Sequence, residues 1–200
     1  MSEFLIDLIR HGEPVGGRRY RGQTDDPLSE AGWQQMWDAV GDYRGWQHIV
    51  TSPLLRCAAF ADALGGRLGI GVTRDERLKE AGFGEWEGKL PAEICADDPL
   101  RLFRFRADPL LHPPAGAEPL LKFHRRVGEA WNAMLGRYGE RHLLVVGHAG
   151  MIRMLMAHAL GLLPQNVYRI NIRNGAISRI RVERVGEQLL PTLLFHDGKL

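Results

Sequence analysis

Short apolar runs alternate with amphipathic segments along most of the 200-residue chain. The first run, residues 4–9, ends abruptly at the polar sequence 10–14, as a buried strand that feeds a loop does. Runs at 49–51 and 143–146 are also typical of buried strands, and a weaker one lies at 70–73. The pattern therefore predicts strands that are widely separated along the chain.

Segments with apolar residues at three- and four-residue spacing follow these runs and predict amphipathic helices. Ser29 is placed to cap a helix whose apolar face occupies residues 33–40. Ser52 opens a second helix, and Gly65 with Gly66 is expected to close it. The first half of the chain thus predicts strand and helix in alternation.

The second half continues this alternation and then changes. Long helical periodicity covers residues 120–138, and a further helix is predicted around 152–159. Alternating apolar residues over 168–172 predict a strand, and Asn174-Gly175 after it suits a tight hairpin turn. The chain is therefore expected to finish with antiparallel edge strands.

Strands that alternate with helices predict an α/β fold, a three-layer α/β/α sandwich with a mainly parallel central sheet and an antiparallel edge. The length favours one domain over residues 1–200. Periodicity largely fails over 77–116, where several prolines punctuate the chain. Within it, residues 86–116 are expected to form an irregular insertion that covers a pocket.

Charge and composition exclude several classes of protein. With 26 basic and 24 acidic residues the chain lacks the global basic field of a nucleic-acid binder. No segment approaches the roughly 20 apolar residues of a membrane span, and the first residues lack the pattern of a signal peptide. Cys57 and Cys95 are too few for a disulfide framework and are not spaced as a zinc site. We expect a cytoplasmic protein with neither nucleic-acid nor membrane partners.

Two histidines mark a candidate site. Arg10-His11 and His148 both follow apolar strands, and ligands of such sheets bind beyond the carboxyl ends of the strands, so these residues are expected to converge. A neutral imidazole can attack phosphorus when fixed cations offset the charge on the phosphoryl oxygens. Arg10 and Arg56 carry planar donor forks that match a phosphate.

Several charged residues have roles that the sequence leaves open. A leaving alkoxide needs a proton, and Glu80, Glu85 or Glu87 could supply it, with composition unable to choose among them. Two groups of arginines could bind a polyanionic substrate or could simply solvate loops. These groups are Arg18, Arg19 and Arg21, and Arg101, Arg104 and Arg106.

Four motifs occur in order along the chain: Leu-Ile-Arg-His-Gly-Glu at 8–13, Thr-Ser-Pro-Leu-Leu-Arg at 51–56, an acid-bearing loop at 78–88 and Val-Gly-His-Ala-Gly at 146–150. Together they resemble the motifs of the histidine phosphatase superfamily, also called the phosphoglycerate mutase-like family. The resemblance spans nearly the whole chain, and the ordered set is far more specific than any single motif. It implies the phosphoglycerate mutase-like fold.

The resemblance also implies roles for individual residues. His11 would become phosphorylated, while Arg10, Arg56 and His148 would bind the transferred phosphoryl group. Glu80 would donate the proton to the leaving group and then accept one from the water that attacks phosphohistidine. The family chemistry implies no metal and no other cofactor.

A narrower resemblance concerns the loop at 20–29, which most resembles that of alpha-ribazole phosphatases, enzymes that act late in cobalamin assembly. It implies that Gly22, Gln23 and Thr24 line the substrate pocket. Ala149 belongs to the small-residue pair after the second histidine, which permits close approach of an anion.

The leading hypothesis is a phosphomonoesterase that acts on a small phosphorylated metabolite, with alpha-ribazole 5′-phosphate as the first candidate. Phosphoglycerate mutase is the alternative, disfavoured by Gly17, where mutases usually carry asparagine, and by the shorter chain. A non-catalytic phosphate-binding module is the third, and the intact set of motif residues argues against it. The sequence leaves open whether the protein is a monomer or a homodimer.

Overall fold

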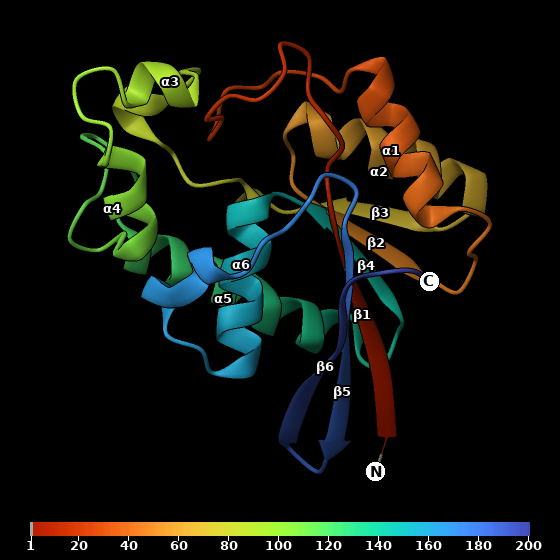
Figure 1. Cartoon of the computed structure of the whole chain (residues 1–200). Helices are drawn as coiled ribbons and strands as arrows, with labels where there is room; N and C mark the ends of the chain where they lie inside the picture. The colour runs from red at the N-terminus through yellow and green to blue at the C-terminus, as the bar shows by residue number, and fades with distance from the viewer. Residues whose placement is uncertain (1) are drawn as a thin grey trace.

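A single six-stranded sheet forms the centre of the computed structural model, which describes residues 2–200 (Figure 1). Its strand order is β3-β2-β4-β1-β5-β6. The strands are β1 (Ser2–Arg10), β2 (His48–Thr51), β3 (Gly71–Arg74), β4 (Leu143–Gly147), β5 (Ile177–Val185) and β6 (Gln188–Gly198). The first four pair in parallel and the last two are antiparallel, which confirms the predicted mainly parallel sheet with an antiparallel edge.

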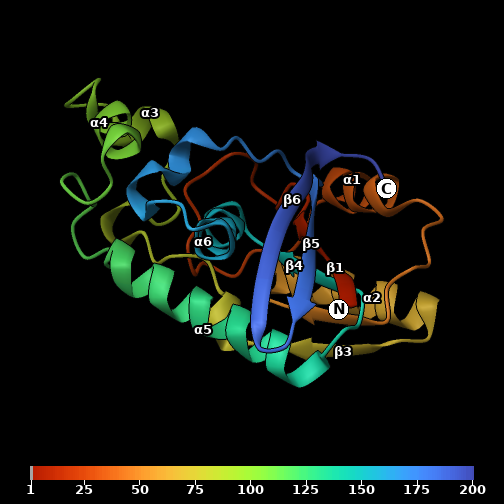
Figure 2. The same cartoon turned by 90° about the horizontal axis from the view of Figure 1, so that it is seen from below.

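Helices cover both faces of the sheet. They are α1 (Glu30–Val40), α2 (Leu55–Leu68), α3 (Pro91–Ile94), α4 (Arg101–Ala107), α5 (Leu120–Tyr138) and α6 (Ala149–Leu160), with short 3₁₀ helices η1 (Glu76–Leu78), η2 (Gly84–Trp86) and η3 (Pro164–Arg169). α1 and α2 lie on one face, and α5 and α6 lie on the other (Figures 1 and 2). The predicted three-layer α/β/α sandwich is confirmed.

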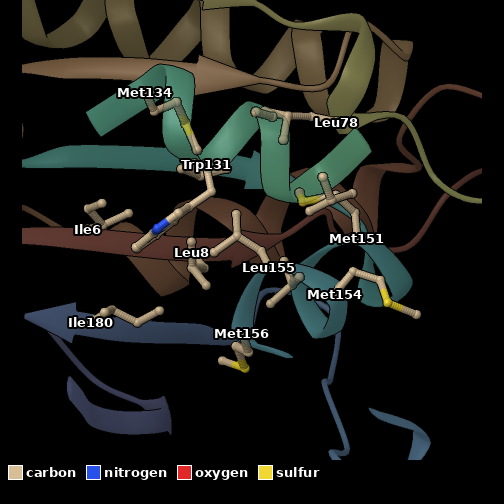
Figure 3. Close-up of a cluster of buried hydrophobic side chains, with 14 of the residues drawn as sticks. Ile6, Leu8, Leu78, Trp131, Met134, Met151, Met154, Leu155, Met156 and Ile180 are labelled. Carbon is tan, nitrogen blue, oxygen red and sulfur yellow. The ribbon is translucent and has the colours of Figure 1, made fainter. Parts of the chain in front are cut away.

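Alternation of side chains along the buried strands creates two cores. In β4, Leu143 and Val145 face α5 and α6, whereas Leu144 and Val146 face α1 and α2. A strand buried on both faces needs apolar residues at every position, which explains the unbroken apolar run. Figure 3 shows the first core, where Trp131 of α5 and methionines of α6 surround the β1 side chains.

The loop after β1 is held tightly against α1. Ser29 caps this helix as predicted, because its Oγ accepts a hydrogen bond from the Gly32 N–H at 3.0 Å. Gly12 passes so close to the same turn that a Cβ on it would lie 2.0 Å from the Gly32 carbonyl oxygen. Only glycine permits this approach, and it fixes the backbone next to His11.

The predicted limits of α2 are wrong at both ends. The helix begins at Leu55, because Ser52 lies in the turn before it and uses its hydroxyl in other hydrogen bonds. It runs through Gly65 and Gly66 to Leu68 and is capped by Gly69, which has a left-handed φ of 67°. Gly65 serves close packing instead, since a Cβ there would lie 2.4 Å from a β3 side chain. Glycine within a helix can thus mark a close contact and not a terminus.

The predicted strand over 168–172 is also wrong, because the chain there forms the end of η3 and an irregular segment. Its carbonyl groups accept hydrogen bonds from arginine side chains. Arg153 donates to the Ile170 carbonyl at 2.8 Å, and Arg10 donates to the Ile172 carbonyl at 2.7 Å. The tight turn between antiparallel strands lies at residues 186–187, whereas Asn174-Gly175 leads into β5.

The irregular region contains short helices and loops, as the loss of periodicity predicted. In Figure 1, α3 and α4 stand away from the sheet, on the side where β1 ends. A separate apolar cluster of Trp86, Ile94, Leu102 and Phe105 holds this region together. The single domain and the insertion limits of 86–116 stay predictions. No helix within residues 2–200 is both long and apolar enough to cross a bilayer.

Candidate active site

The two histidines of the motifs meet at one edge of the sheet. β1 and β4 are adjacent and parallel, and Arg10 is in register with Gly147, so His11 and His148 leave the sheet at the same level. Their ring centroids are 5.2 Å apart, and both side chains are buried. The predicted convergence is confirmed.

The His11 ring is held in one tautomer. Its Nδ1 lies 2.7 Å from the Gly12 carbonyl oxygen, which can only accept, so Nδ1 carries the proton and Nε2 keeps its lone pair. Burial lowers the pKa of His11 well below its usual 6.5, and the charges of Arg10 and Arg56 lower it further. The ring is therefore neutral at physiological pH, as a nucleophile must be.

Arg10 lies beside this ring and lines the same cavity. Its Nη1 donates to the Ile172 carbonyl at 2.7 Å, which fixes the guanidinium. Its Nε is buried and has no hydrogen-bond partner within residues 2–200. Burial and the charge of the nearby Arg153 together lower the pKa of Arg10 to about 10, yet the group stays charged at neutral pH. An unpaired, charged donor here favours an anionic ligand.

Arg56 and His148 lie together behind the cavity. Arg56 is fully buried and donates to the Gly22 and Thr24 carbonyls at 2.8 and 2.7 Å, and its Nε donates to His148 Nδ1 at 3.2 Å. His148 Nε2 must then carry a proton, and it lies 2.7 Å from Ser52 Oγ. Both residues are near His11, but both are engaged with protein groups, so phosphoryl binding by them stays a prediction.

Of the three candidate acids, Glu80 is the one that reaches the cavity. It is buried, its Oε2 accepts from the Gly150 N–H at 2.8 Å, and it lines the same cavity as Arg10 and His11. A Cβ on Gly150 would lie 2.3 Å from Glu80 Oε1, so the start of α6 must be glycine here to admit the carboxylate. This contact explains the glycine at position 150, two residues after the second histidine.

The other two candidate carboxylates have structural partners. Burial raises the pKa of Glu87, but hydrogen bonds from the Phe83 N–H, the Thr24 hydroxyl and the Gly22 N–H lower it by more, so Glu87 is a fixed anion. Glu85 forms an ion pair with Arg101. Neither lines the cavity with His11, and the structure therefore favours Glu80.

Arg126 of α5, which was not predicted from the sequence, holds the backbone that carries Glu80. Its Nη1 donates to the carbonyls of Arg77 and Lys79 at 2.6 and 2.7 Å, and its Nη2 donates to the Glu80 carbonyl at 3.1 Å. An ion pair with Glu118 fixes the guanidinium. Helical periodicity could not find this residue, because an arginine off the apolar face is usually solvated.

The cavity beside His11 has a volume of about 630 Å³ and is rich in arginine. The arginines that line it are Arg10, Arg18, Arg19, Arg21, Arg106, Arg153, Arg169 and Arg173. Ala149 also lines it, and its contact with substrate stays a prediction. Arg153 was not predicted from the sequence, although an arginine inside the apolar sequence of α6 was an available signal.

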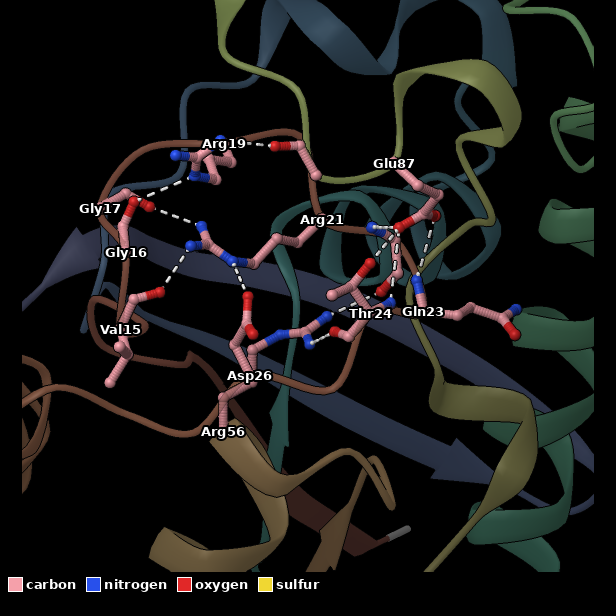
Figure 4. A network of polar contacts seen from close by, with 12 residues as sticks. Val15, Gly16, Gly17, Arg19, Arg21, Gln23, Thr24, Asp26, Arg56 and Glu87 are labelled. Carbon is pink, nitrogen blue, oxygen red and sulfur yellow. Dashed lines mark hydrogen bonds and ion pairs between the residues drawn. The ribbon is translucent and has the colours of Figure 1, made fainter.

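The predicted pocket residues of the 20–29 loop have structural roles (Figure 4). Gly22 and Thr24 are tied to Glu87 and Arg56. Gln23 and Thr24 line a separate hollow of about 480 Å³, and none of the three lines the cavity at His11. Their contact with substrate stays a prediction.

The two arginine groups divide residue by residue. Arg21 is buried and holds its own loop closed through Asp26 and the Val15 and Gly17 carbonyls (Figure 4). Arg101 and Arg104 pair with Glu85 and Asp98 outside the cavity. Arg18, Arg19 and Arg106 line the cavity, and none has a carboxylate partner in the part of the chain that the structure describes. Within residues 2–200, no three or more His, Cys, Asp or Glu side chains are grouped to hold a metal ion.

Known proteins of similar sequence carry more than one activity in their names. A bifunctional protein of Mycobacterium tuberculosis is 34% identical over 176 residues, which are 86% of this chain and 48% of that protein. The chain thus spans about half the length of the first relatives it matches. Glucosyl-3-phosphoglycerate phosphatase of Mycolicibacterium vanbaalenii is 33% identical over 78% of this chain and 73% of that protein. "Probable phosphoglycerate mutase GpmB" of Erwinia tasmaniensis is 30% identical over 88% of this chain and 83% of that protein.

Structure and family comparison agree with these relatives. The mycobacterial glucosyl-3-phosphoglycerate phosphatase, solved with VO3, superposes with a TM-score of 0.85 and 28% identity over 96% of this chain and 98% of that one. Residues 6–192 match the histidine phosphatase superfamily (branch 1). The match covers most of the chain, including all four motifs. The chain therefore belongs to branch 1 of the histidine phosphatase superfamily.

Proposed function

We propose that the protein hydrolyses a small phosphate monoester through a phosphohistidine intermediate on His11. The observation that carries this proposal is the state of the His11 ring: neutral, with Nδ1–H held by the Gly12 carbonyl and the Nε2 lone pair available at a cavity that also contains Arg10 and Glu80. Phosphoryl transfer is mostly positioning and charge stabilisation, and this arrangement supplies both.

The reaction has two steps. In the first, His11 Nε2 forms a bond to phosphorus, the ester P–O bond breaks, and Glu80 gives its proton to the leaving oxygen. In the second, ionised Glu80 takes a proton from water, the water oxygen attacks phosphorus, and the P–N bond breaks to release phosphate and neutral His11. Arg10 offsets the charge on the phosphoryl oxygens. Arg56 and His148 would also bind these oxygens, by giving up hydrogen bonds to protein groups and donating to the phosphoryl group instead.

Hydrolysis is proposed over mutase activity, although relatives carry both names. A mutase must retain its phosphohistidine and return the phosphoryl group, whereas a phosphatase needs only to admit water. Gly17 lines the cavity and has no side chain with which to contact an intermediate.

Two substrates are candidates. The proposal of alpha-ribazole 5′-phosphate rests on the resemblance of the 20–29 loop, and the proposal of an ester of the phosphoglycerate type rests on the name of a relative. A cytoplasmic location and a place in cobalamin assembly stay predictions.

Hydrolysis of para-nitrophenyl phosphate in excess chelator tests the proposal. We expect turnover that the chelator does not reduce, together with a phosphoryl group on the peptide that contains His11 after an alkaline quench, since phosphohistidine is stable to base. Wild-type protein quenched without substrate is the control for phosphorylation that was present before the reaction. Loss of turnover with chelator, or a phosphoryl group on a different peptide, would contradict the proposed mechanism.

Glu80→Gln should slow alkyl phosphates more than an aryl phosphate. The amide keeps an acceptor for the Gly150 N–H but has no proton to give, and a para-nitrophenolate leaves without protonation. We expect kcat/KM, which reports the first step alone, to fall on the order of 10²-fold or more with glycerol 3-phosphate and clearly less with para-nitrophenyl phosphate. Glu85→Gln, the same change at the carboxylate paired with Arg101, should alter neither rate. An equal fall in kcat/KM for both substrates would exclude Glu80 as the acid of the first step.

A further inference from the structure

The cavity holds far more positive charge than one phosphoryl group needs. Eight arginines line it, against the carboxylates of Glu13 and Glu80. Within residues 2–200, only Arg21 and Arg173 among these arginines are ion-paired, with Asp26 and Asp197. The formal charge of the whole chain is +2, so the excess is local to this cavity. A dianionic phosphoryl group beside His11 would engage Arg10 and leave most of the other cations without a counter-charge.

Arg153 is the most constrained of these spare cations. It is on α6, one helical turn beyond Ala149 and Gly150, and its Nε donates to the Ile170 carbonyl at 2.8 Å. Its guanidinium lies 5.3 Å from the centre of the Tyr168 ring, which holds it against the cavity wall. Its two terminal nitrogens have no hydrogen-bond partner among residues 2–200. A fixed fork with free donors in a cavity is suited to a carboxylate or a phosphate.

α4 places a second cation near the first. Leu102 and Phe105 are buried in the apolar cluster of the irregular region, and Phe105 packs against Tyr168, the same ring that supports Arg153. This packing turns the next residue, Arg106, into the cavity, where its Nη2 lies 3.3 Å from the Tyr20 hydroxyl. The arginines on the other side of α4 are paired with acids and lie outside the cavity. Arg106 is therefore not part of a uniformly solvated basic helix.

We propose that the leaving alcohol of the substrate carries a second anionic group, a carboxylate or a phosphate, which Arg153 and Arg106 bind. This inference rests on the proposed function, since it concerns the substrate of the same site. A neutral alcohol would leave these cations desolvated by the substrate and without a partner, whereas an anion would form charge-assisted hydrogen bonds with both. The site then selects against simple esters with uncharged alcohols.

Two matched substrate pairs test this inference. 3-Phosphoglycerate and glycerol 3-phosphate differ by a carboxylate in place of a hydroxymethyl group, and fructose 1,6-bisphosphate and fructose 6-phosphate differ by one phosphate. In at least one pair, we expect kcat/KM to be on the order of 10²-fold higher for the substrate that carries the second anionic group. The pair that shows the preference identifies the second group as carboxylate or phosphate.

Arg153→Gln should abolish that preference and leave turnover of para-nitrophenyl phosphate within a few-fold of wild type. Arg106→Gln should reduce the preference too, and because Arg106 is exposed this variant is expected to fold even if Arg153→Gln does not. Arg104→Gln removes the same charge from α4 outside the cavity and should change nothing.

Three outcomes would overturn parts of the account, and they are distinguishable. No preference in either pair, with para-nitrophenyl phosphate still hydrolysed, overturns the second-anion inference and leaves the proposed function intact. A preference that survives in both arginine variants overturns the assignment to Arg153 and Arg106. Failure of the wild type to hydrolyse para-nitrophenyl phosphate or any member of the pairs overturns the proposed function itself.

Discussion

His11→Ala should lower turnover of para-nitrophenyl phosphate on the order of 10⁴-fold or more, because the variant has no nucleophile to form the covalent intermediate. The fold should survive the change. Within residues 2–200 the ring makes one hydrogen bond, to the adjacent Gly12 carbonyl, and it lies at the end of β1 outside the apolar clusters. Loss of about 1 kcal/mol in a chain of this size lowers the thermal midpoint by roughly 2–4 °C.

His112→Ala is the matched control, since it removes an exposed histidine from a loop that does not line the cavity. It should match the wild type in turnover and in thermal midpoint. Steady-state kinetics and thermal unfolding measured on the same preparations separate loss of chemistry from loss of structure. Turnover near the wild-type rate in His11→Ala would exclude His11 as the nucleophile and with it the phosphohistidine mechanism.

The position of the site could be predicted because it depends on local signals. An apolar run that stops at Arg10-His11 and another that stops before His148 define two strand ends, and parallel pairing brings such ends to one edge of a sheet. No long-range contact had to be known for this. The Ser29 cap is local in the same sense, and it too agrees with the structure.

Residues whose position depends on tertiary contacts could not be found in this way. Arg126 acts through carbonyl groups about 46 to 49 positions earlier in the chain, and nothing near it in sequence marks those partners. Tyr168 and Ile170 alternate as a strand would, yet they are placed by Phe105 and by the Arg153 side chain. A period of two over five residues cannot distinguish a strand from an irregular segment with alternate burial.

The three candidate carboxylates show why chemistry within a motif needs the structure. Glu80, Glu85 and Glu87 are the same residue type and lie within one segment of eight residues, so composition does not distinguish them. Their environments differ through distant partners: the start of α6 for Glu80, Arg101 for Glu85 and the 22–24 loop for Glu87. The residue that could be an acid is the one left in contact with the cavity.

Asp7→Asn should lower the free energy of unfolding by about 3 kcal/mol, a fall of roughly 6–12 °C in thermal midpoint. Asp7 is fully buried on β1, where its carboxylate forms two hydrogen bonds with Arg179, at 2.7 and 2.9 Å, and further bonds with Trp46 and His142. An amide in its place leaves the partly buried Arg179 without its counter-charge. The amide N–H groups would also lie opposite donors, where the carboxylate has an acceptor oxygen. Asp62→Asn, the same change in the exposed ion pair with Arg74, should cost less than about 1 kcal/mol.

The pH dependence gives an independent check on this network. Burial raises the pKa of Asp7, but hydrogen bonds from Arg179, His142 and Trp46 outweigh it and hold the pKa below the usual 3.8. A carboxylate whose pKa is lowered by folding contributes its stability above the unfolded value and loses it as the pH falls through the folded value. The difference between wild type and Asp7→Asn should thus be complete at pH 7 and shrink below about pH 4. Chemical unfolding of both proteins at a series of pH values measures it, and a difference that stays constant to pH 3 would mean that steric mismatch, and not the lost charge, destabilises the variant.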